Sequence, residues 1–524
     1  MSPAIHQVAR VEDLPTGRGT RVCVRHDGKE VPLLLVRDGD TVRAWSADCP
    51  HAGAPLEEGT ICNGRLVCPW HKGTFDLNDG SIVEPPPLKP LTRYAATVRD
   101  GNVFVSLETE EDARTQRIKN GSTSRTVLIA GAGAAGAAAS AALREAGFEG
   151  RIVLAGGDAR EPYDRTSLSK FVVAGDMPVD DVPPLLDPDF FATQKIERIE
   201  SRVARLDANA KRAELDDGTA IDYDAALVCT GGTPKPPDIP GTNLTHVHLL
   251  RNRDDARAIL ASLDDAGAQG AAKRVVIAGA SFIGLEVAGG LRKRNIDVHV
   301  ICPADVPFAK QFGVRIGERI KRLHEENGVI FHTRARVSAL RGDRAVREVV
   351  LDTGEHLPAD VVIAATGVTP ATSFLSGIQL NDDRSVTVDA GMMAAPGLYA
   401  AGDVARFPLP RSQAHVRIEH WRVAQQLARV AAMNIAGEPC EYVGVPYFWT
   451  WHYEKTIDYL GHVDDPDSVE IDGDLDALNF IAYLVKDGEV RAIVACERGD
   501  ATGRLSEAMR EPLTLEEARR IAEA

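Results

Sequence analysis

The sequence is poor in cysteine and lacks long apolar runs, and each shortage excludes a class of protein. Only 8 of the 524 residues are cysteine, and their spacing indicates no disulfide framework of the kind found in small secreted domains. No apolar run reaches the roughly 18 residues that a membrane-spanning helix needs. The first residues also lack the basic stretch and apolar core of a secretory signal. We therefore expect a cytoplasmic protein with no membrane span.

Basic residues are outnumbered by acidic ones. The chain has 60 Lys and Arg against 76 Asp and Glu, which gives a formal net charge of −16. This balance disfavours nucleic acid and acidic membrane surfaces as partners, because both are negatively charged. The chain is also too long for a single hydrophobic core, so we expect several domains.

Two cysteine–histidine pairs are the most informative feature present. Cys49-Pro-His51 and Cys68-Pro-Trp-His71 are separated by 16 residues, and each pair supplies one thiolate and one imidazole. In a Rieske [2Fe–2S] cluster, two cysteines hold one iron and two histidines hold the other. Tetrahedral zinc accepts the same ligand types and stays an alternative. The proline after each cysteine and the run 70–76 resemble Rieske ferredoxins.

The residues around these pairs predict a low-potential, ferredoxin-like centre. Hydrogen bonds to the sulfurs raise the potential of such a cluster. Respiratory-type Rieske proteins carry a Ser and a Tyr two and four residues after the last histidine, whereas this chain has Gly73 and Phe75. The first loop contains no cysteine with which Cys62 could form a disulfide. We therefore interpret Cys62 as a structural thiol.

A glycine motif with Gly131, Gly133 and Gly136 lies between a predicted strand, 126–130, and an alanine-rich helix that runs to about residue 145. Glycines at this turn let the backbone approach a pyrophosphate at the N-terminus of the helix. A second strand, 151–154, leads to Asp158, where a ribose hydroxyl would need an acceptor. The segment therefore predicts a dinucleotide-binding site.

A second copy of the motif follows, with Gly279, Ser281 and Gly284. We expect a strand at 273–278, a helix at 285–294 and a further strand at 297–301, with serine replacing the middle glycine. The position at which an NAD-specific site places an acid holds Cys302. No arginine cluster for a 2′-phosphate follows it, so we expect NADH and leave NADPH open.

Two dinucleotide motifs in one chain, together with Thr366-Gly367-Val and Gly402-Asp403-Val, resemble the two-dinucleotide flavoprotein family built like glutathione reductase. The resemblance implies FAD at the first site, NAD(P)H at the second, and Asp403 at the ribityl chain of the flavin. The Cys-x4-Cys pair of the disulfide reductases is missing after the first motif.

The segment 161–170 instead resembles ferredoxin reductases of oxygenase systems and apoptosis-inducing-factor-like proteins. With the Rieske-like segment, the whole chain resembles Rieske-containing, apoptosis-inducing-factor-like oxidoreductases. The resemblance implies a catalytic group of Lys170 near the flavin N5, Glu286 as its partner, and Trp421 on the isoalloxazine. A surface lysine, a solvated glutamate and a core tryptophan are the alternatives. Further expected cofactor-binding residues are Arg165, Glu419, His420 and Gly367, in addition to both glycine motifs, Asp158 and Asp403.

The expected fold class is multi-domain, with an all-β Rieske domain, α/β FAD and NAD(P) domains, and a small α+β C-terminal domain. The expected boundaries are 1–108 for the Rieske domain, 109–124 for a polar linker, 125–241 and 366–436 for the FAD domain, 242–365 for the NAD(P) domain, and 437–524 for the C-terminal domain.

The expected function is electron transfer from NADH through FAD to a [2Fe–2S] cluster and on to a protein acceptor such as an oxygenase component or a cytochrome. Two alternatives stay open. One is a self-contained NADH oxidase or quinone reductase, and the other is a non-enzymatic, redox-sensing binding protein. The acceptor and the oligomeric state, including a homodimer, have no sequence motif that identifies them.

Overall fold

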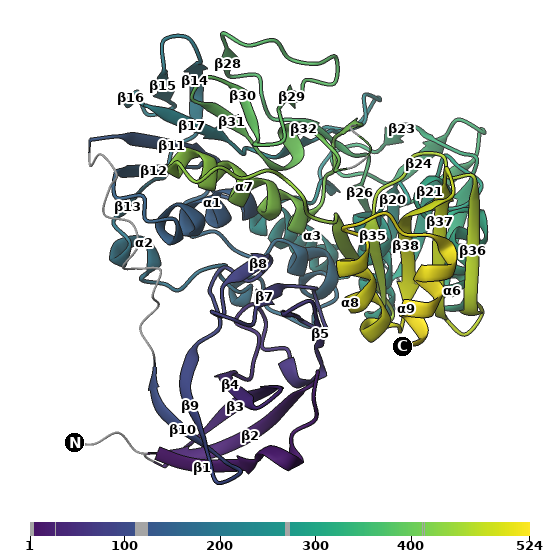
Figure 1. Cartoon of the computed structure of the whole chain (residues 1–524). Coiled ribbons are helices and arrows are strands. Elements are labelled where there is room, and N and C mark those ends of the chain that lie inside the picture. Colours follow the sequence, from purple (N-terminus) through teal and green to yellow (C-terminus); the bar gives the residue numbers. More distant parts are fainter. Residues whose placement is uncertain (1–4, 27, 110–123, 268–272, 411, 413) are drawn as a thin grey trace.

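The computed structural model describes residues 5–26, 28–109, 124–267, 273–410, 412 and 414–524, and it places them in two lobes (Figure 1). The N-terminal lobe, residues 5–109, lies at the bottom of Figure 1, and the larger lobe, residues 124–524, lies above it. The predicted linker, 109–124, lies outside the described residues except for its two end positions.

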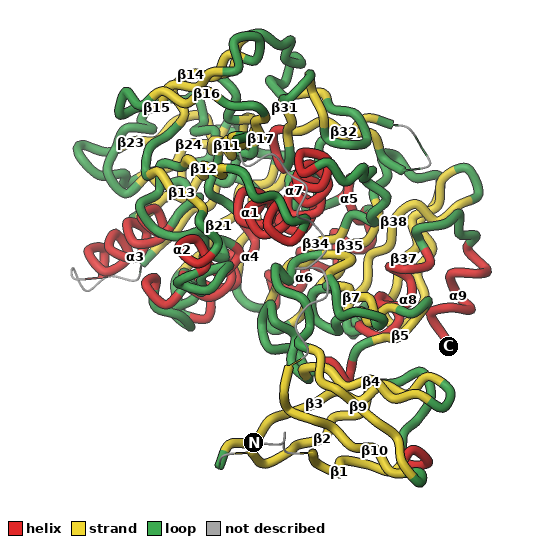
Figure 2. The backbone as a smooth tube through the Cα atoms, turned by 60° about the vertical axis from the view of Figure 1, so that its left-hand side comes forward, coloured by secondary structure: helices red, strands yellow, loops and turns green. Residues whose placement is uncertain are grey.

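The N-terminal lobe is built from antiparallel strands, and Figure 2 shows its larger sheet standing apart from the rest of the molecule. The larger sheet has the order β1-β10-β9-β4-β3-β2, with β1 (Ile5–Arg10), β2 (Gly19–His26), β3 (Lys29–Asp38), β4 (Thr41–Ser46), β9 (Arg93–Arg99) and β10 (Asn102–Thr109). The smaller sheet has the order β5-β6-β7-β8, with β5 (Thr60–Cys62), β6 (Arg65–Val67), β7 (Thr74–Asp76) and β8 (Ile82–Glu84).

Side chains of β3 point alternately to the two faces of the larger sheet, and each face packs against a small hydrophobic core. Leu33 and Leu35 belong to one cluster, whereas Leu34 and Val36 face the cluster that contains both cysteines of the predicted cluster site. Successive side chains of a strand point to opposite faces, so a single apolar strand can serve both cores. The lobe thereby has its own hydrophobic interior beneath the loops that carry the cysteine–histidine pairs.

The first glycine motif follows β11 of a sheet with the order β13-β12-β11-β17-β31-β30, which is parallel except for its edge strand β30. Its strands are β11 (Thr126–Ala130), β12 (Arg151–Ala155), β13 (Ile196–Ile199), β17 (Ala225–Val228), β30 (Met393–Ala395) and β31 (Leu398–Ala400). Helices α1 (Ala134–Glu145) and α7 (Trp421–Ala436) pack against each other and against the sheet. The small alanine side chains of α1 permit this close contact, and α1 ends at the predicted residue.

The second glycine motif follows β20 of an all-parallel sheet with the order β19-β26-β20-β21-β22. Its strands are β19 (Val247–His248), β20 (Arg274–Ala278), β21 (Asp297–Cys302), β22 (Val329–Thr333) and β26 (Val361–Ala364). The predicted helix start at residue 285 is wrong, because α4 (Phe282–Lys293) begins three positions earlier. The Ser281 hydroxyl caps the helix by accepting a hydrogen bond from the Gly284 amide at 3.2 Å.

The C-terminal segment forms an antiparallel sheet, β34-β35-β38-β37-β36, which shares one hydrophobic core with the sheet of the second motif. Its elements are β34 (Tyr447–His452), β35 (Lys455–Gly461), β36 (Ser468–Asp474), β37 (Asn479–Lys486), β38 (Glu489–Cys496), α8 (Gly499–Ala508) and α9 (Leu515–Glu523). Helix α8 contacts β5 of the N-terminal lobe, so the C-terminal segment touches both other parts of the molecule (Figure 1).

The remaining elements complete the larger lobe. The helical ones are η3 (Leu168–Val172), a single π-helical turn, the short 3-10 turns η4 (Val179–Asp181) and η5 (Gly402–Val404), and α2 (Phe190–Thr193), α3 (Arg253–Gly267), α5 (Ala309–Phe312) and α6 (Val314–Glu326). The strands are β14 (Val203–Asp207), β15 (Arg212–Leu215), β16 (Ala220–Asp222), β18 (Gly232–Pro234), β23 (Val337–Arg341), β24 (Glu348–Leu351), β25 (His356–Pro358), β27 (Val368–Pro370), β28 (Leu375–Ser376), β29 (Val386–Thr387), β32 (Ala405–Pro408) and β33 (His415–Val416). Among the residues that the structure describes, no helix is both long and apolar enough to cross a membrane.

Candidate redox site

A large cleft with a volume of about 1390 Å³ runs from the first glycine motif to the C-terminal sheet. It brings together residues that the sequence predicted for cofactor binding from four separate segments. Those residues are Gly131, Gly133, Asp158, Arg165, Lys170, Glu286, Asp403, Glu419, His420 and Trp421. Gly136, Gly279, Ser281, Gly284 and Gly367 do not line it. The cleft exceeds the roughly 300–1,000 Å³ typical of small-molecule sites, as an extended dinucleotide with a second ligand beside it requires.

Gly133 of the first motif leaves open space at the N-terminus of α1. A Cβ atom on Gly133 would have no heavy atom within 4 Å, and Gly133 lines the cleft. A Cβ atom on Gly136, in contrast, would lie 2.0 Å from the Gly131 carbonyl oxygen, so Gly136 permits contact between helix and strand. The free amides of a helix N-terminus and the space above Gly133 fit a pyrophosphate.

Two acidic side chains at the cleft are paired with arginines. Asp158 accepts a hydrogen bond from Arg160 Nε at 2.8 Å, and Asp403 lies 3.3 Å from Arg251 Nη2. Both aspartates and both arginines line the cleft.

Lys170 and Glu286 meet in the structure. Lys170 lies in the π-helical turn η3 and Glu286 in α4, and their side chains approach to 3.0 Å between Nζ and Oε1. Glu286 also accepts hydrogen bonds from Ser169 Oγ at 2.5 Å and from Thr450 Oγ1 at 2.8 Å. Both partners of the ion pair are buried. The alternatives of a surface lysine and a solvated glutamate are therefore wrong.

His420 and Trp421 line the cleft where α7 begins. His420 Nδ1 and Trp421 Nε1 are buried without a hydrogen-bond partner in the described structure, an uncommon state for polar atoms in a folded protein. Burial lowers the pKa of His420 to about 3, so the imidazole is neutral. Burial also raises the pKa of Glu419 above its ordinary value. Unpaired polar atoms in a cleft wall fit a polar, flat ligand.

The second glycine motif has the same backbone geometry as the first. Gly279 has a φ of 116°, and a Cβ atom on Gly284 would lie 2.3 Å from the Gly279 carbonyl oxygen. Glu286, two residues after Gly284, reaches the cleft, so this motif approaches it from the side of the Lys170–Glu286 pair. Beyond β21, Asp305 pairs with Arg334.

The two cysteine–histidine pairs converge at the tip of the N-terminal lobe. His51 Nδ1 and His71 Nδ1 lie 3.2 Å apart, and Cys49 and Cys68 are both buried. A hydrogen bond between the two thiols is the largest cause of a raised pKa at Cys49. Paired nitrogens and paired sulfurs fit a cluster in which each iron takes two protein ligands.

Trp449 of β34 connects the two parts of the site. Its ring centroid lies 4.2 Å from that of His71, and the same indole lines the large cleft. Lys170 Nζ lies 5.8 Å from the Trp449 ring centroid. The segment 445–450 resembles the C-terminal segment of ferredoxin reductases, but the sequence alone assigns no role to Trp449, because an aromatic side chain in such a segment is also typical of a core residue.

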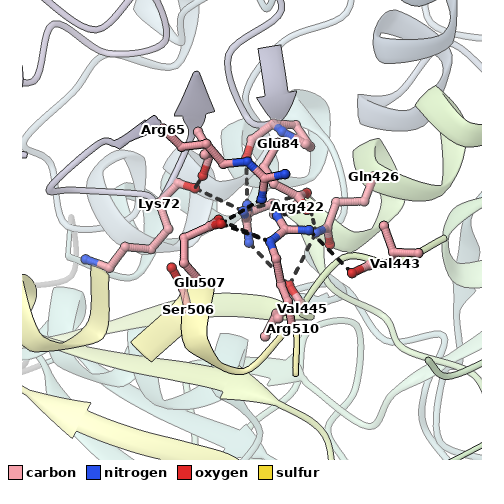
Figure 3. Close-up of polar contacts among 12 residues, drawn as sticks. Arg65, Lys72, Glu84, Arg422, Gln426, Val443, Val445, Ser506, Glu507 and Arg510 are labelled. Atoms are coloured by element: carbon pink, nitrogen blue, oxygen red, sulfur yellow. Dashed lines mark hydrogen bonds and ion pairs between the residues drawn. The ribbon is translucent and has the colours of Figure 1, made fainter. Parts of the chain in front are cut away.

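A buried ionic cluster fixes the N-terminal lobe on the larger lobe beside this contact (Figure 3). Glu84 accepts hydrogen bonds from Arg510 Nη2 at 2.7 Å and from Gln426 Nε2 at 2.6 Å, and it lies 3.8 Å from Arg422 Nη2. Burial alone would raise the pKa of Glu84, but Arg422 and Arg510 bring it below its ordinary value. The sequence does not predict this cluster, because charged residues far apart in sequence carry no sign of mutual burial.

A second contact lies next to the histidine ligand position. Lys72 is 1% exposed, and its Nζ donates to the Pro69 carbonyl at 2.7 Å and to the Gly499 carbonyl at 3.4 Å. Arg422 Nη2 donates to the Lys72 carbonyl at 2.9 Å. The loop that carries His71 is therefore held by both the C-terminal segment and α7.

Comparison with known proteins agrees with both parts of the site. Residues 125–428 match the family described as pyridine nucleotide-disulphide oxidoreductase, and residues 4–95 match the Rieske [2Fe-2S] domain. The chain belongs to the pyridine nucleotide-disulphide oxidoreductases and carries a Rieske domain. As a member of this family it is a flavoprotein oxidoreductase that uses FAD, NAD(P)H and a [2Fe–2S] cluster.

Its relatives include proteins of both expected groups. The chain is 34% identical to apoptosis-inducing factor 3 from Homo sapiens over 96% of this chain and 83% of that protein. It is 33% identical to the ferredoxin–NAD(+) reductase component of the biphenyl dioxygenase system from Paraburkholderia xenovorans, over 71% of this chain and 89% of that one.

Solved structures of ferredoxin reductases share the fold. The ferredoxin reductase for the CYP199A2 system from Rhodopseudomonas palustris has a TM-score of 0.70 at 30% identity, covering 75% of this chain and 96% of that one. The covalent putidaredoxin reductase–putidaredoxin complex has a TM-score of 0.70 at 27% identity, covering 77% of this chain and all of the matched one.

Proposed function

We propose that this protein is a fused reductase and ferredoxin, which passes electrons from NADH through FAD to its own Rieske cluster and on to a protein acceptor. FAD accepts two electrons as a hydride and returns them singly, whereas the cluster carries one electron at a time. The contact between His71 and Trp449 carries this proposal, because it joins the cluster loop to the wall of the cleft within one chain.

In this proposal, the cleft residues divide into binding and electrostatic roles. Gly133 and the N-terminus of α1 bind the pyrophosphate, and Asp158 and Asp403 accept hydrogen bonds from ribose and ribityl hydroxyls. The Lys170 ammonium stabilises negative charge at the flavin ring, and Glu286 holds that ammonium in place while lining the nicotinamide site. Trp421 packs against the ring system.

Cys49, His51, Cys68 and His71 are the proposed cluster ligands. Within that set, His71 faces the larger lobe, because its ring contacts Trp449. The imidazole and the indole provide an unbroken aromatic path between the cluster loop and the cleft. Fixed docking through Glu84 keeps the two rings in contact.

The acceptor is a one-electron protein of the oxygenase or cytochrome type. This proposal follows from the relatives, since one is named as a component of a biphenyl dioxygenase system and one solved neighbour is a complex with putidaredoxin. The domain boundaries given above and the preference for NADH belong to the same proposal. A homodimer stays a prediction.

The proposal is tested by replacing Trp449 and measuring cluster reduction in the full chain. After mixing with NADH under anaerobic conditions, flavin bleaching is followed by absorbance and cluster reduction by rapid-freeze electron paramagnetic resonance. We expect Trp449→Leu to lower the rate of cluster reduction roughly tenfold relative to flavin bleaching.

Trp451→Leu is the matched control, because Trp451 lies on the same strand but its ring is beside Phe171. The control should keep the wild-type ratio of the two rates. A cluster that is reduced equally fast in Trp449→Leu and in the wild type contradicts the proposed path.

A further inference from the structure

A chain of hydrogen bonds leads away from the Lys170–Glu286 pair, and it starts at Glu286 Oε1, the oxygen that Lys170 also approaches. We call it the relay chain, and it consists of Thr450, His452, His324 and Tyr453. Thr450 Oγ1 lies 2.8 Å from Glu286 Oε1 and 3.1 Å from His452 Nε2. His452 Nδ1 lies 3.2 Å from His324 Nε2, and His324 Nδ1 lies 3.3 Å from the Tyr453 hydroxyl.

The relay chain runs from the buried interior to the surface. Thr450 and His324 are fully buried and His452 is 1% exposed. Tyr453 is partly exposed and follows the last residue of β34, in the tight turn before β35. The chain therefore leads from the wall of the cleft, through the shared core of β34 and α6, to a surface turn.

Every member of the relay chain can both donate and accept a hydrogen bond. Burial lowers the pKa of both imidazoles, so each carries one proton and offers one free nitrogen. With Glu286 ionised, the hydroxyls and N–H groups can all point toward Glu286. With Glu286 protonated, they can all point the other way. The two patterns differ by the passage of one proton along the chain.

The reaction of the proposed function needs such an exit. When NADH is oxidised by a one-electron acceptor A, the balance is NADH + 2 A(ox) → NAD⁺ + H⁺ + 2 A(red). The C–H bond of the nicotinamide breaks, its two electrons end on two acceptor molecules, and its proton must reach solvent. At Trp449 the wall of the cleft is in contact with His71 of the N-terminal lobe.

We propose that the relay chain carries this proton between Glu286 and solvent at Tyr453. The inference rests on the proposed function only in requiring that NADH be oxidised by a one-electron acceptor. Lys170 and Arg292 are the charged groups that act on the chain, at His452 and Tyr453 respectively. Both are cations. Lys170, near the inner end, favours outward movement by raising the cost of a proton at His452, whereas Arg292, at the outer end, acts to lower the pKa of Tyr453. The relay residues act on the reaction only through Glu286, and their hydrogen bonds form the path along which the proton moves.

Three variants of the full chain test the relay. Tyr453→Phe removes one hydroxyl at the surface end, and Thr450→Val removes the hydroxyl next to Glu286, whereas Thr450→Ser keeps it. Tyr223→Phe is the control, because the Tyr223 hydroxyl is partly buried and donates to a backbone carbonyl, and Tyr223 does not line the cleft.

Proton release is followed by stopped-flow absorbance with a pH indicator, with NADH as donor and ferricyanide as acceptor, in H₂O and in D₂O. We expect Tyr453→Phe and Thr450→Val to slow proton release by roughly tenfold or more and to change the solvent isotope effect. Thr450→Ser and Tyr223→Phe should stay near the wild-type rate. If Thr450 and Tyr453 had a purely structural role, Thr450→Ser would not restore the rate of proton release, and the solvent isotope effect would not change.

A second measurement does not depend on turnover. In protein labelled with ¹⁵N-histidine, solvent exchange of the His452 and His324 ring N–H groups is read by NMR. We expect slower exchange in Tyr453→Phe than in Tyr223→Phe. Wild-type proton release and wild-type exchange in Tyr453→Phe together overturn the relay. If the wild type oxidises no NADH, the proposed function fails, and the exchange measurement still decides whether the path exists.

Discussion

The imidazole of His71 and the indole of Trp449 lie 4.2 Å apart, although one belongs to the N-terminal lobe and the other to the C-terminal sheet. The contact places a proposed cluster ligand directly on the wall of the cleft of its own chain. A long linker would also allow the N-terminal lobe to reach a neighbouring subunit. The buried interface around Glu84 favours the arrangement within one chain.

Replacing His71 with alanine should remove the Rieske spectrum while FAD stays bound. Cys49 and Cys68 belong to one hydrophobic core and the residues around the first glycine motif belong to another, so loss of a cluster ligand should not unfold the flavin site. Electron paramagnetic resonance of the reduced variant and its flavin content test this expectation. An unchanged Rieske spectrum would show that His71 is not a ligand.

Replacing Gly133 with leucine should expel FAD, because the side chain would enter the open space at the N-terminus of α1. Replacing Gly284 with alanine should spare FAD and raise the KM for NADH, because the new Cβ would clash with the Gly279 carbonyl oxygen. Flavin absorbance and NADH kinetics separate the two effects. If flavin is lost from the Gly284 variant and kept in the Gly133 variant, the two sites are reversed.

Replacing Glu84 with glutamine should weaken the docking of the N-terminal lobe. Breaking a buried ion pair by removing one partner costs about 3–5 kcal/mol, because Arg422 and Arg510 would lose their shared counter-ion. Urea unfolding and the rate of proteolytic release of the N-terminal lobe measure the change.

Glu30→Gln is the control for this prediction, because Glu30 forms an exposed pair with Arg25. Surface pairs contribute only about 0–1 kcal/mol, so the control should behave as the wild type. Equal stability of the two variants would mean that the Glu84 cluster does not hold the lobes together.

Stability should fall as the pH drops below 6.5, in part because of His452. Burial lowers the pKa of His452 to about 3, whereas an unfolded histidine titrates near 6.5. The unfolded state therefore binds more protons between these values, and the free energy of unfolding decreases as the pH falls through that window. At pH 5 the contribution is about 2 kcal/mol.

The variant His452→Gln should accordingly lose less stability than the wild type between pH 7 and pH 5, by about 2 kcal/mol. Urea unfolding monitored by tryptophan fluorescence at both pH values measures the difference. His356→Gln, at an exposed position, should keep the wild-type pH dependence. A wild-type pH dependence in His452→Gln would contradict a buried, neutral imidazole.

A chain that begins at residue 122 should bind FAD and oxidise NADH but fail to reduce a protein acceptor that the full chain reduces. It keeps the cleft and loses the one-electron path that begins at His71. Separately expressed residues 1–110 should restore part of the activity in excess, since a linker acts by raising effective concentration. Equal rates with and without the N-terminal lobe, for every acceptor, would favour the oxidase or sensor alternatives.

The two glycine turns and the proposed cluster ligands can be identified from the amino-acid sequence without the structure. Gly131, Gly133 and Gly136 are informative because the backbone must pass close to itself and to a ligand within six residues, and only glycine allows this. Cys49 and His51, like Cys68 and His71, are close in sequence, so their spacing alone limits the metal geometry. The predicted start of α4 is wrong by three residues, because the cap formed by Ser281 is a local detail that hydrophobic periodicity does not show.

Which distant side chains come into contact depends on how the folded lobes pack together. Lys170 contacts Glu286, and His71 contacts Trp449, because the packing of whole lobes and sheets sets these distances. No local sequence pattern encodes that packing. Glu84 and His452 also show what cannot be predicted from the sequence. A charged or titratable residue carries no mark in the sequence that tells whether it will be solvated or buried with a partner, and that difference fixes its energy, its protonation state and its role.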